Sequence, residues 1–200
     1  MLGYHPGAYE GAIFLQGQEL STWQGEAFRA RIAPVFQDNR LFSGTILDNL
    51  KMVHSRTTEA HTDSELTDAI DRYLETLEIP AVMLQQDVQE QGSALSGGES
   101  QRIAVARALI KDAELYVFDE PTSALDSVTE AKLNDLLQTA MVGKTVITVS
   151  HKLSAVAHMD RIYYLRDGKI IESGTHEELM ALDGAYASTY RMQAQEEVPA

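Results

Sequence analysis

The sequence predicts an α/β fold with a mostly parallel sheet and an inserted helical segment. Two apolar runs, residues 115–118 (Leu-Tyr-Val-Phe) and 145–149 (Thr-Val-Ile-Thr-Val), have the composition of buried strands. Several other segments carry apolar residues at the three- and four-residue spacing of helices. Strands that alternate with helical patterns favour a parallel sheet.

The first part of the chain predicts strands and then a helical insert. Residues 11–20 indicate strand and turn, and residues 32–36 indicate a further strand, although Pro34 weakens that assignment. Asp63-Ser64-Glu65 opens a helix that Pro80 ends. We expect the apolar stripe of this helix to lie in the core, and it consists of Leu66, Ile70, Leu74 and Leu77.

A capped helix is predicted to begin within residues 95–102, which read Leu-Ser-Gly-Gly-Glu-Ser-Gln-Arg. Ser96 and Glu99 have the spacing of a capping box. Gly97 and Gly98 leave the first turn without side chains, so backbone donors at the positive end of the helix dipole can approach an anion. A Ser-x-x-Glu string alone is also explained by an ordinary capped helix.

Polar side chains recur where predicted strands end. Asp119 and Glu120 end the run 115–118, His151 follows the run 145–149, and Gln37 follows residues 32–36. Open α/β sheets bind ligands at the carboxyl ends of their strands, so these residues are candidates for one site. Taken alone, Asp119 and Glu120 are also explained by an acidic surface turn. A lone histidine or glutamine, such as His151 or Gln37, is also explained by a structural role.

The end of the chain predicts a hairpin and a short helix. The hairpin turns at Asp167-Gly168, and Thr175 with Glu178 forms a second capping box. His176 thus has a structural explanation, and the other histidines outside the strand ends share no metal-ligand spacing.

Composition restricts the class of protein. The chain has 200 residues, no cysteine and a formal charge of −14, which argues against nucleic acid or an anionic membrane surface as a direct partner. No apolar run approaches the roughly 18 residues of a membrane span, and no signal peptide is recognisable. We therefore expect a cytoplasmic domain whose link to a membrane runs through protein.

These residues resemble, in the family's order, the motifs of an ATP-binding cassette (ABC) ATPase. The Q-loop, signature, Walker B, D-loop and switch histidine correspond to Gln37, residues 95–99, residues 115–120, residues 123–126 and His151. The exporter type is indicated by residues 41–50, by Glu90 and Gly92, and by residues 174–179. The likeness extends from about residue 11 to residue 179.

The resemblance implies a P-loop NTPase-like (RecA/F1-like) core sheet, with the N-terminal strands missing. Residues 1–38 and 112–200 would form the core α/β lobe, and residues 39–111 the helical subdomain with the signature motif. No G-x-x-x-x-G-K-S/T string, the P-loop motif, occurs in the chain. Residues 143–145 (Gly-Lys-Thr) match the end of the motif, but its first glycine would have to stand at position 138, which is Gln138. In the family the P-loop lies just upstream of the segment that residues 2–15 resemble.

The resemblance also implies roles for individual residues in Mg²⁺-dependent ATP hydrolysis by a head-to-tail dimer. Glu120 would act on the attacking water, His151 would sense the γ-phosphate, and Asp119 and Gln37 would contact Mg²⁺. The remaining nucleotide contacts and interface residues implied are Ser96, Gly97, Gly98, Glu99, Gln37 and Asp126. The partners would be a second ABC ATPase domain and the membrane domains of an exporter, at the cytoplasmic face of the membrane.

Three hypotheses follow from the sequence. The chain is an incomplete stretch of an exporter ATPase whose upstream part carries the P-loop, and alone should not hydrolyse ATP. Alternatively, it is a non-catalytic subunit that lends its signature motif to an intact partner. A soluble ABC ATPase of DNA repair or translation is the third, which the acidic charge and the exporter-like residues 41–50 disfavour.

Overall fold

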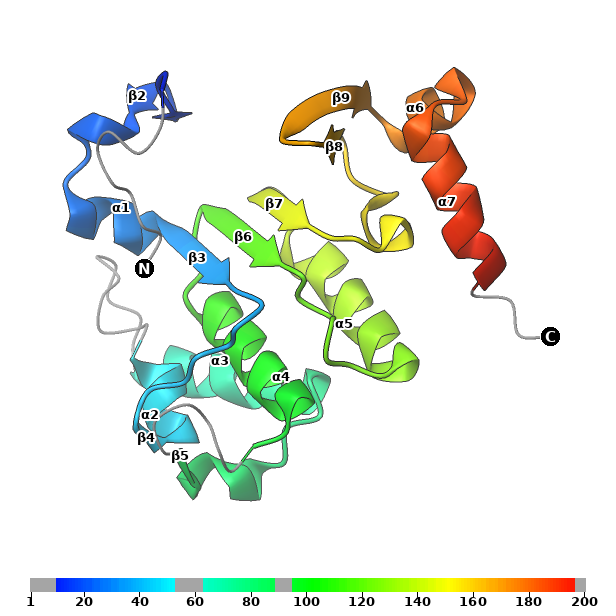
Figure 1. The fold of residues 1–200 in the computed structure, drawn as a ribbon. Coiled ribbons are helices and arrows are strands. Elements are labelled where there is room, and N and C mark those ends of the chain that lie inside the picture. The colour runs from blue at the N-terminus through cyan, green and yellow to red at the C-terminus, as the bar shows by residue number, and fades with distance from the viewer. Residues whose placement is uncertain (1–9, 53–62, 89–94, 197–200) are drawn as a thin grey trace. The chain divides into compact units, whose positions relative to one another are not determined.

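The computed structural model describes residues 10–52, 63–88 and 95–196 (Figure 1). The chain divides into two compact units, Met1–Ile147 and Thr148–Ala200. The first unit holds Gln37, the signature segment and the paired acids, and the second holds His151.

The first unit alternates strands and helices. Its elements in chain order are β1 (Phe14–Leu15), β2 (Gln18–Glu19), η1 (Leu20–Thr22), α1 (Gly25–Arg31), β3 (Ile32–Val35), β4 (Gly44–Thr45), α2 (Ile46–Lys51), α3 (Asp63–Thr76), η3 (Ala81–Gln85), β5 (Asp87–Val88), α4 (Gly97–Ile110), β6 (Leu115–Asp119), α5 (Ser127–Ala140) and β7 (Thr145–Val149). The boundary between the units falls within β7. Strands form at both predicted runs, 115–118 and 145–149, as β6 and β7. The predicted burial of 145–149 is wrong, because no residue of β7 is buried and Ile147 and Val149 are exposed. The strand and turn predicted at 11–20 form the β1–β2 hairpin.

The main sheet has the strand order β3-β6-β7. β3 and β6 run parallel, with Ile32 opposite Leu115 and Val35 opposite Phe118, so their carboxyl ends lie at the same edge. In the sheet as described, β3 is an edge strand. An edge strand tolerates proline because one row of its backbone groups makes no ladder bonds, which explains how Pro34 lies within β3.

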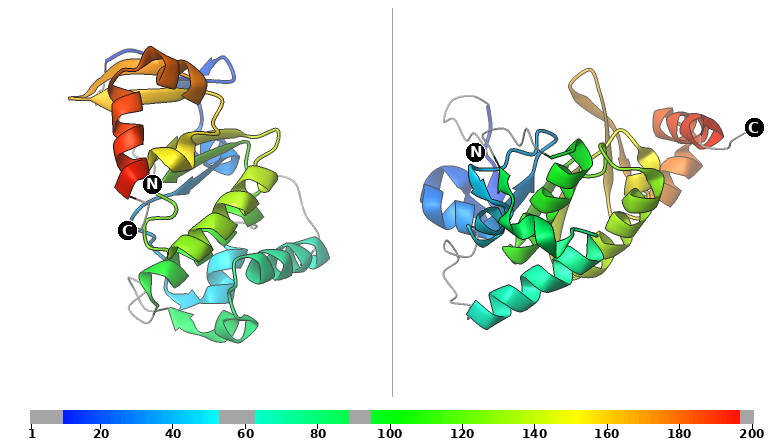
Figure 2. Two further views of the ribbon diagram at one scale, coloured as in Figure 1. Left: turned by 90° about the vertical axis from the view of Figure 1, so that its right-hand side faces the viewer. Right: turned by 90° about the horizontal axis from the view of Figure 1, so that it is seen from below.

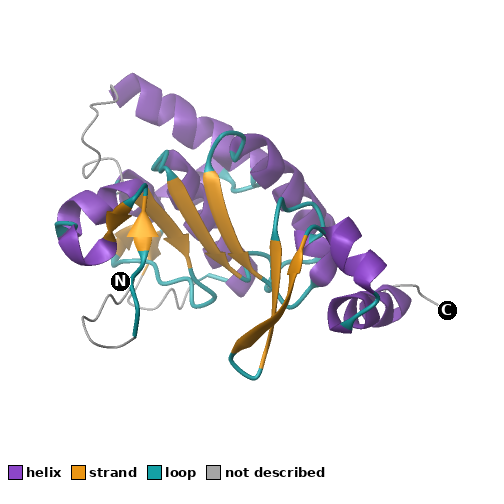
Figure 3. Ribbon diagram, turned by 90° about the horizontal axis from the view of Figure 1, so that it is seen from above, coloured by secondary structure: helices purple, strands orange, loops and turns teal. Residues whose placement is uncertain are grey.

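The core of the first unit lies between this sheet and its helices (Figures 1 and 3). Tyr116 and Phe118 of β6 are buried in one cluster with α4 residues such as Ile103 and Val105. The alternate β6 residues are only partly buried, so the predicted burial of this strand holds for one of its faces. Tyr116 and Phe118 belong to the cluster that residues of α2, α3, α4 and α5 also form, whereas Leu115 and Val117 do not.

The helical insert packs its predicted stripe inward. Leu66, Ile70, Leu74 and Leu77 are all buried, and α3 lies along α4 (Figure 2, right). Helix α3 ends in a Schellman motif: the Ile79 amide donates to Leu74 O at 2.9 Å, and the Glu78 amide donates to Glu75 O at 3.2 Å. Glu78 takes the left-handed conformation that this motif requires, with φ 52°.

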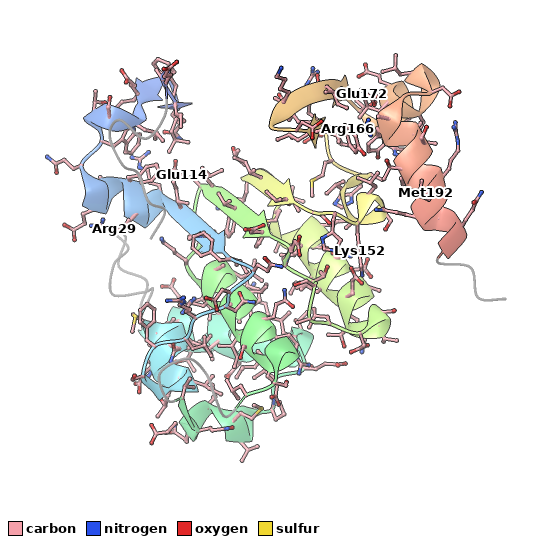
Figure 4. All side chains as sticks on the ribbon, in the orientation of Figure 1. Arg29, Glu114, Lys152, Arg166, Glu172 and Met192 are labelled. Atoms are coloured by element: carbon pink, nitrogen blue, oxygen red, sulfur yellow. The ribbon has the colours of Figure 1, made fainter. Side chains whose placement is uncertain are left out.

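The second unit is a hairpin covered by two helices. Its elements are η4 (Leu153–Val156), β8 (Ile162–Arg166), β9 (Lys169–Gly174), α6 (His176–Leu182) and α7 (Ala185–Glu196). The hairpin turn at Asp167-Gly168 is confirmed, with φ 50° and 72°, as is the capping box of Thr175. Glu172 of β9, labelled in Figure 4, lies near the start of α7. It accepts hydrogen bonds from the Ala185 and Tyr186 amides and thereby caps this helix.

Candidate functional site

The structure brings Gln37 and Glu120 together at the carboxyl edge of the sheet. Gln37 follows β3 and Glu120 follows β6, and these strands are neighbours in register. The Gln37 amide Nε2 donates to Glu120 Oε2 at 3.2 Å, although the two residues are 83 positions apart. Two residues that the sequence predicted for one site are therefore in contact.

Glu120 has an unusual backbone conformation. Its φ is 50°, in the left-handed region that non-glycine residues seldom adopt, and Pro121 follows it. Such a residue costs about 1–3 kcal/mol and persists only where its surroundings hold it. Here the Glu120 carbonyl accepts from the Ser123 amide at 3.2 Å and from Gln101 Nε2 at 2.9 Å.

The predicted capping box opens α4. Ser96 Oγ accepts from the Glu99 amide at 3.2 Å, and Glu99 Oε2 accepts from both the amide and the hydroxyl of Ser96 at 2.8 Å. These hydrogen bonds, the backbone one first, lower the pKa of Glu99. The Glu99 carboxylate therefore serves as a structural cap, and its predicted nucleotide contact stays a prediction.

The glycine pair packs against the loop that follows the paired acids. A Cβ on Gly98 would meet Ala124 O at 3.2 Å and Leu125 Cδ2 at 3.4 Å. A Cβ on Gly97 would meet the Ala124 Cβ at an ordinary 3.5 Å. The Gly98 position thus needs glycine for a close backbone approach, whereas the Gly97 position has room for a methyl group.

Asp126 is the N-cap of α5. Its carboxylate accepts from the Thr129 hydroxyl at 2.7 Å and from the Val128 and Thr129 amides at 3.1 Å. The Thr129 side chain and then the backbone amides hold the pKa of Asp126 below its ordinary value. The role of this exposed residue at a dimer interface stays a prediction.

His151 is an exposed residue of the second unit, and Ser150 separates it from the end of β7. Its carbonyl accepts from Gln193 Nε2 at 2.7 Å, and Gln193 Oε1 accepts from the Leu153 amide at 2.9 Å, which ties the loop to α7. Its role as the switch histidine stays a prediction.

Comparison with known proteins identifies the family. The family model described as "ABC transporter" matches residues 2–123. This chain belongs to the ABC transporter family. Its predicted P-loop NTPase-like α/β class is confirmed by a solved structure of a bacterial Atm1-family ABC exporter with ATP bound, with TM-score 0.81 and 32% identity over 93% of this chain and 32% of that one.

The curated relatives are also ABC proteins. ABC transporter B family member 19 of Arabidopsis thaliana is 40% identical over 183 residues, which is 92% of this chain and 14% of the relative. The ATP-dependent lipid A-core flippase of Paraburkholderia xenovorans is 38% identical over 186 residues, which is 93% of this chain and 31% of the relative. This ABC transporter chain therefore spans less than a third of the length of each of these two relatives. Among the described residues, no helix is both long and apolar enough to cross a bilayer.

The donor set of this ABC transporter chain suits magnesium better than a transition metal. Asp119 and Glu120 offer carboxylate oxygens and Gln37 offers an amide oxygen, all at the ends of β6 and β3. Mg²⁺ prefers such hard oxygen ligands and retains several waters, so it needs few protein ligands. Within residues 10–52, 63–88 and 95–196, no group of three or more His, Cys, Asp or Glu could hold a metal by itself.

Sequence reasoning missed Gln101. It is fully buried, and it bonds both Glu120 and Ala124. A polar residue on the apolar face of α4 was the available signal, because a buried amide needs partners.

The capping box of Thr45 and Asp48 on α2 was missed too. Glu90 and Gly92 lie outside the described residues.

The two signature glycines provide a first prediction. We expect Gly97→Ala to leave the free energy of unfolding unchanged or to raise it by up to about 1 kcal/mol, since alanine favours helix. Gly98→Ala should lose that gain and lower stability, because the added methyl crowds the Ala124 carbonyl. Urea unfolding followed by the fluorescence of Trp23, the single tryptophan and a residue of the first unit, measures both. Equal stability of the two variants would contradict the packing described.

A second prediction concerns pH. Folding lowers the pKa of Glu99 from 4.5 and the pKa of Asp48 and Asp126 from 3.8. A carboxyl group whose pKa is lower in the folded state stabilises the fold at any pH above its pKa in the unfolded state. That stabilisation is lost as the pH falls through the pKa of the group in the folded state. The first unit should therefore lose stability as the pH falls below about 5. Glu99→Gln, which keeps a capping box, should weaken this dependence, and an unchanged dependence would count against the assignment.

Proposed function

We propose that this chain is part of the ATP-hydrolysing domain of an ABC exporter, active in a head-to-tail pair with a second such domain. The contact between Gln37 and Glu120 carries the proposal, because it joins two separate motif residues at the ligand edge of the sheet. The match to exporter relatives supports the same reading.

Each residue has a chemical task in this proposal. Glu120 accepts a proton from the attacking water or orients it, and Gln37, which donates to that carboxylate, holds its direction. Asp119 would hold Mg²⁺, which when bound neutralises phosphate charge. His151 senses the γ-phosphate.

The signature turn acts on the nucleotide of the opposite domain. Ser96 offers a hydroxyl when it releases its hydrogen bond to Glu99 Oε2. Gly97 and Gly98 lie in the bare first turn of α4, where backbone donors and the helix dipole favour an anion. ATP thus bridges two domains, and its binding closes the pair. Asp126 lies at this interface, and the membrane domains of the exporter contact the pair at the cytoplasmic face.

The chain holds no G-x-x-x-x-G-K-S/T string, so the test supplies one in a partner. The partner is an exporter ATPase domain that has a P-loop but whose signature serine is replaced by arginine. Two copies of this partner cannot hydrolyse ATP together, because neither supplies a working signature turn to the other. Added wild-type chain should restore ATP hydrolysis, saturating at one chain per partner. Hydrolysis that stays at the level of the disabled partner would contradict the proposal.

A further inference from the structure

A buried amide joins the first turns of α4 to the loop after β6. Gln101 is fully buried. Its Nε2 donates to the Glu120 carbonyl at 2.9 Å, and its Oε1 accepts from the Ala124 amide at 3.0 Å. A carbonyl only accepts and an amide N–H only donates, so these partners fix the orientation of the Gln101 amide and require both of its ends.

The first of these bonds acts on the conformation of Glu120. This residue is left-handed and half-buried, and its carbonyl receives hydrogen bonds from Gln101 and from the Ser123 amide. Two donors fix the direction of that carbonyl. The Glu120 side chain is attached to the Cα of the same residue. The position of its carboxylate beside Gln37 therefore depends on the same backbone conformation.

The second bond lies beside the signature glycines. A Cβ on Gly98 would crowd Ala124 O and meet Leu125, and a Cβ on Gly97 would lie at ordinary contact distance from the Ala124 Cβ. Residues 97–101 and 120–125 therefore meet at the Gln101 amide, and both glycines lie close to Ala124. A displacement of the turn at 97–98 would therefore shift Glu120 and Ala124 through their hydrogen bonds to Gln101, and Ser123 lies between them.

We propose that Gln101 is a positioning residue that couples the signature turn to Glu120 of the same chain, an inference that rests on the proposed function. In a head-to-tail pair, the signature turn serves one ATP and Glu120 serves the other. Gln101 thus links the two sites within one protomer. Engagement of the signature turn by a nucleotide changes the Glu120 loop through this amide.

Amide hydrogen exchange on the whole chain tests the hydrogen-bonding part. Gln101→Met fills a similar volume but neither donates nor accepts, so Ala124 and Ser123 should exchange about tenfold faster relative to the core amides of α4. Gln101→Glu retains an acceptor for Ala124 and loses the donor for Glu120 when its carboxyl is ionised, so only Ser123 should speed up above the pKa of this carboxyl, and the effect should disappear when the carboxyl is protonated. Val105→Ala is the matched control, because Val105 is fully buried one turn further along α4.

The control separates coupling from packing. Val105→Ala should accelerate the core and loop amides together. If the Gln101 variants accelerate all amides in the same proportion, Gln101 is a packing residue and the inference is wrong. Should Gln101→Met fail to fold, the Gln101→Glu pattern decides by itself.

Nuclear magnetic resonance with a partner tests the coupling. The partner carries a P-loop and has its own catalytic glutamate replaced by glutamine, so that ATP and magnesium stay bound. In the wild-type chain, the signals of Gly97 and Gly98 should shift on addition, and those of Ser123 and Ala124 should shift with them. In Gln101→Met, the glycine shifts should remain and the loop shifts should be lost.

The two failures are distinct. Unmoved glycine signals in the wild-type chain would contradict the proposed function itself. Glycine signals that move while the loop of Gln101→Met responds as in wild type would leave the proposed function intact and overturn the role of Gln101.

Discussion

Glu120→Gln should lower ATP turnover by about 10²-fold or more while ATP binding is retained. Glutamine matches glutamate in shape and keeps an oxygen that can accept from Gln37 Nε2, so the geometry at the edge of the sheet survives. Only the ability to take a proton is lost. The assay requires a P-loop, which is supplied by joining the corresponding segment of an exporter relative to the N-terminus of the chain.

Glu114→Gln is the matched control for this change. Glu114, labelled in Figure 4, precedes the first residue of the same strand, β6. Its carboxylate contacts Gln16 and Arg31 on the surface. Glu114 lies at the opposite end of β6 from Glu120. The Glu114→Gln variant should therefore hydrolyse ATP as fast as the unsubstituted chain that carries the added P-loop segment. Parent-like turnover in Glu120→Gln, or an equal loss in both variants, would overturn the assignment of Glu120.

Ser96→Arg should abolish the hydrolysis that the chain restores to a signature-disabled partner, with a loss of about 10²-fold or more. The bulky cation would fill the space in front of the α4 N-terminus and remove the hydroxyl that faces the nucleotide in our proposal. The measurement is ATP turnover at saturating ratios of variant chain to partner.

Thr45→Arg tests whether this loss is only the cost of a broken cap. Thr45 opens α2 with the same capping box, in which its hydroxyl accepts from the Asp48 amide at 3.0 Å. Removal of either cap should cost about 1 kcal/mol of stability. Thr45→Arg should nevertheless restore hydrolysis. A similar loss in the two variants would show that the effect of Ser96→Arg is one of folding.

The strands and helix ends were predictable because their signals are local. Capping boxes at Ser96 and Thr175 depend on residues three positions apart, and the turn at Asp167-Gly168 depends on adjacent ones. Strand ends then placed Gln37 and Glu120 at one edge, and their contact was within reach of the sequence.

The contacts across the fold were not predictable in the same way. The bonds of Gln101 reach residues 19 and 23 positions away, and no local pattern encodes such pairs. The left-handed conformation of Glu120 is also imposed by its partners, since neither glutamate nor a following proline favours it. The edge position that accommodates Pro34 depends on the order of strands in the sheet.

Cross-linking tests most directly the central claim that the signature turn engages a nucleotide held by another domain. The chain has no cysteine, so Ser96→Cys introduces a single thiol, and Val142→Cys places one on an exposed residue as control. The partner carries one cysteine beside its P-loop, and a short thiol-reactive cross-linker joins the two. We predict cross-linking of Ser96→Cys that depends on ATP and none for Val142→Cys. Cross-linking that is absent, or equal for both sites and indifferent to ATP, would contradict the account.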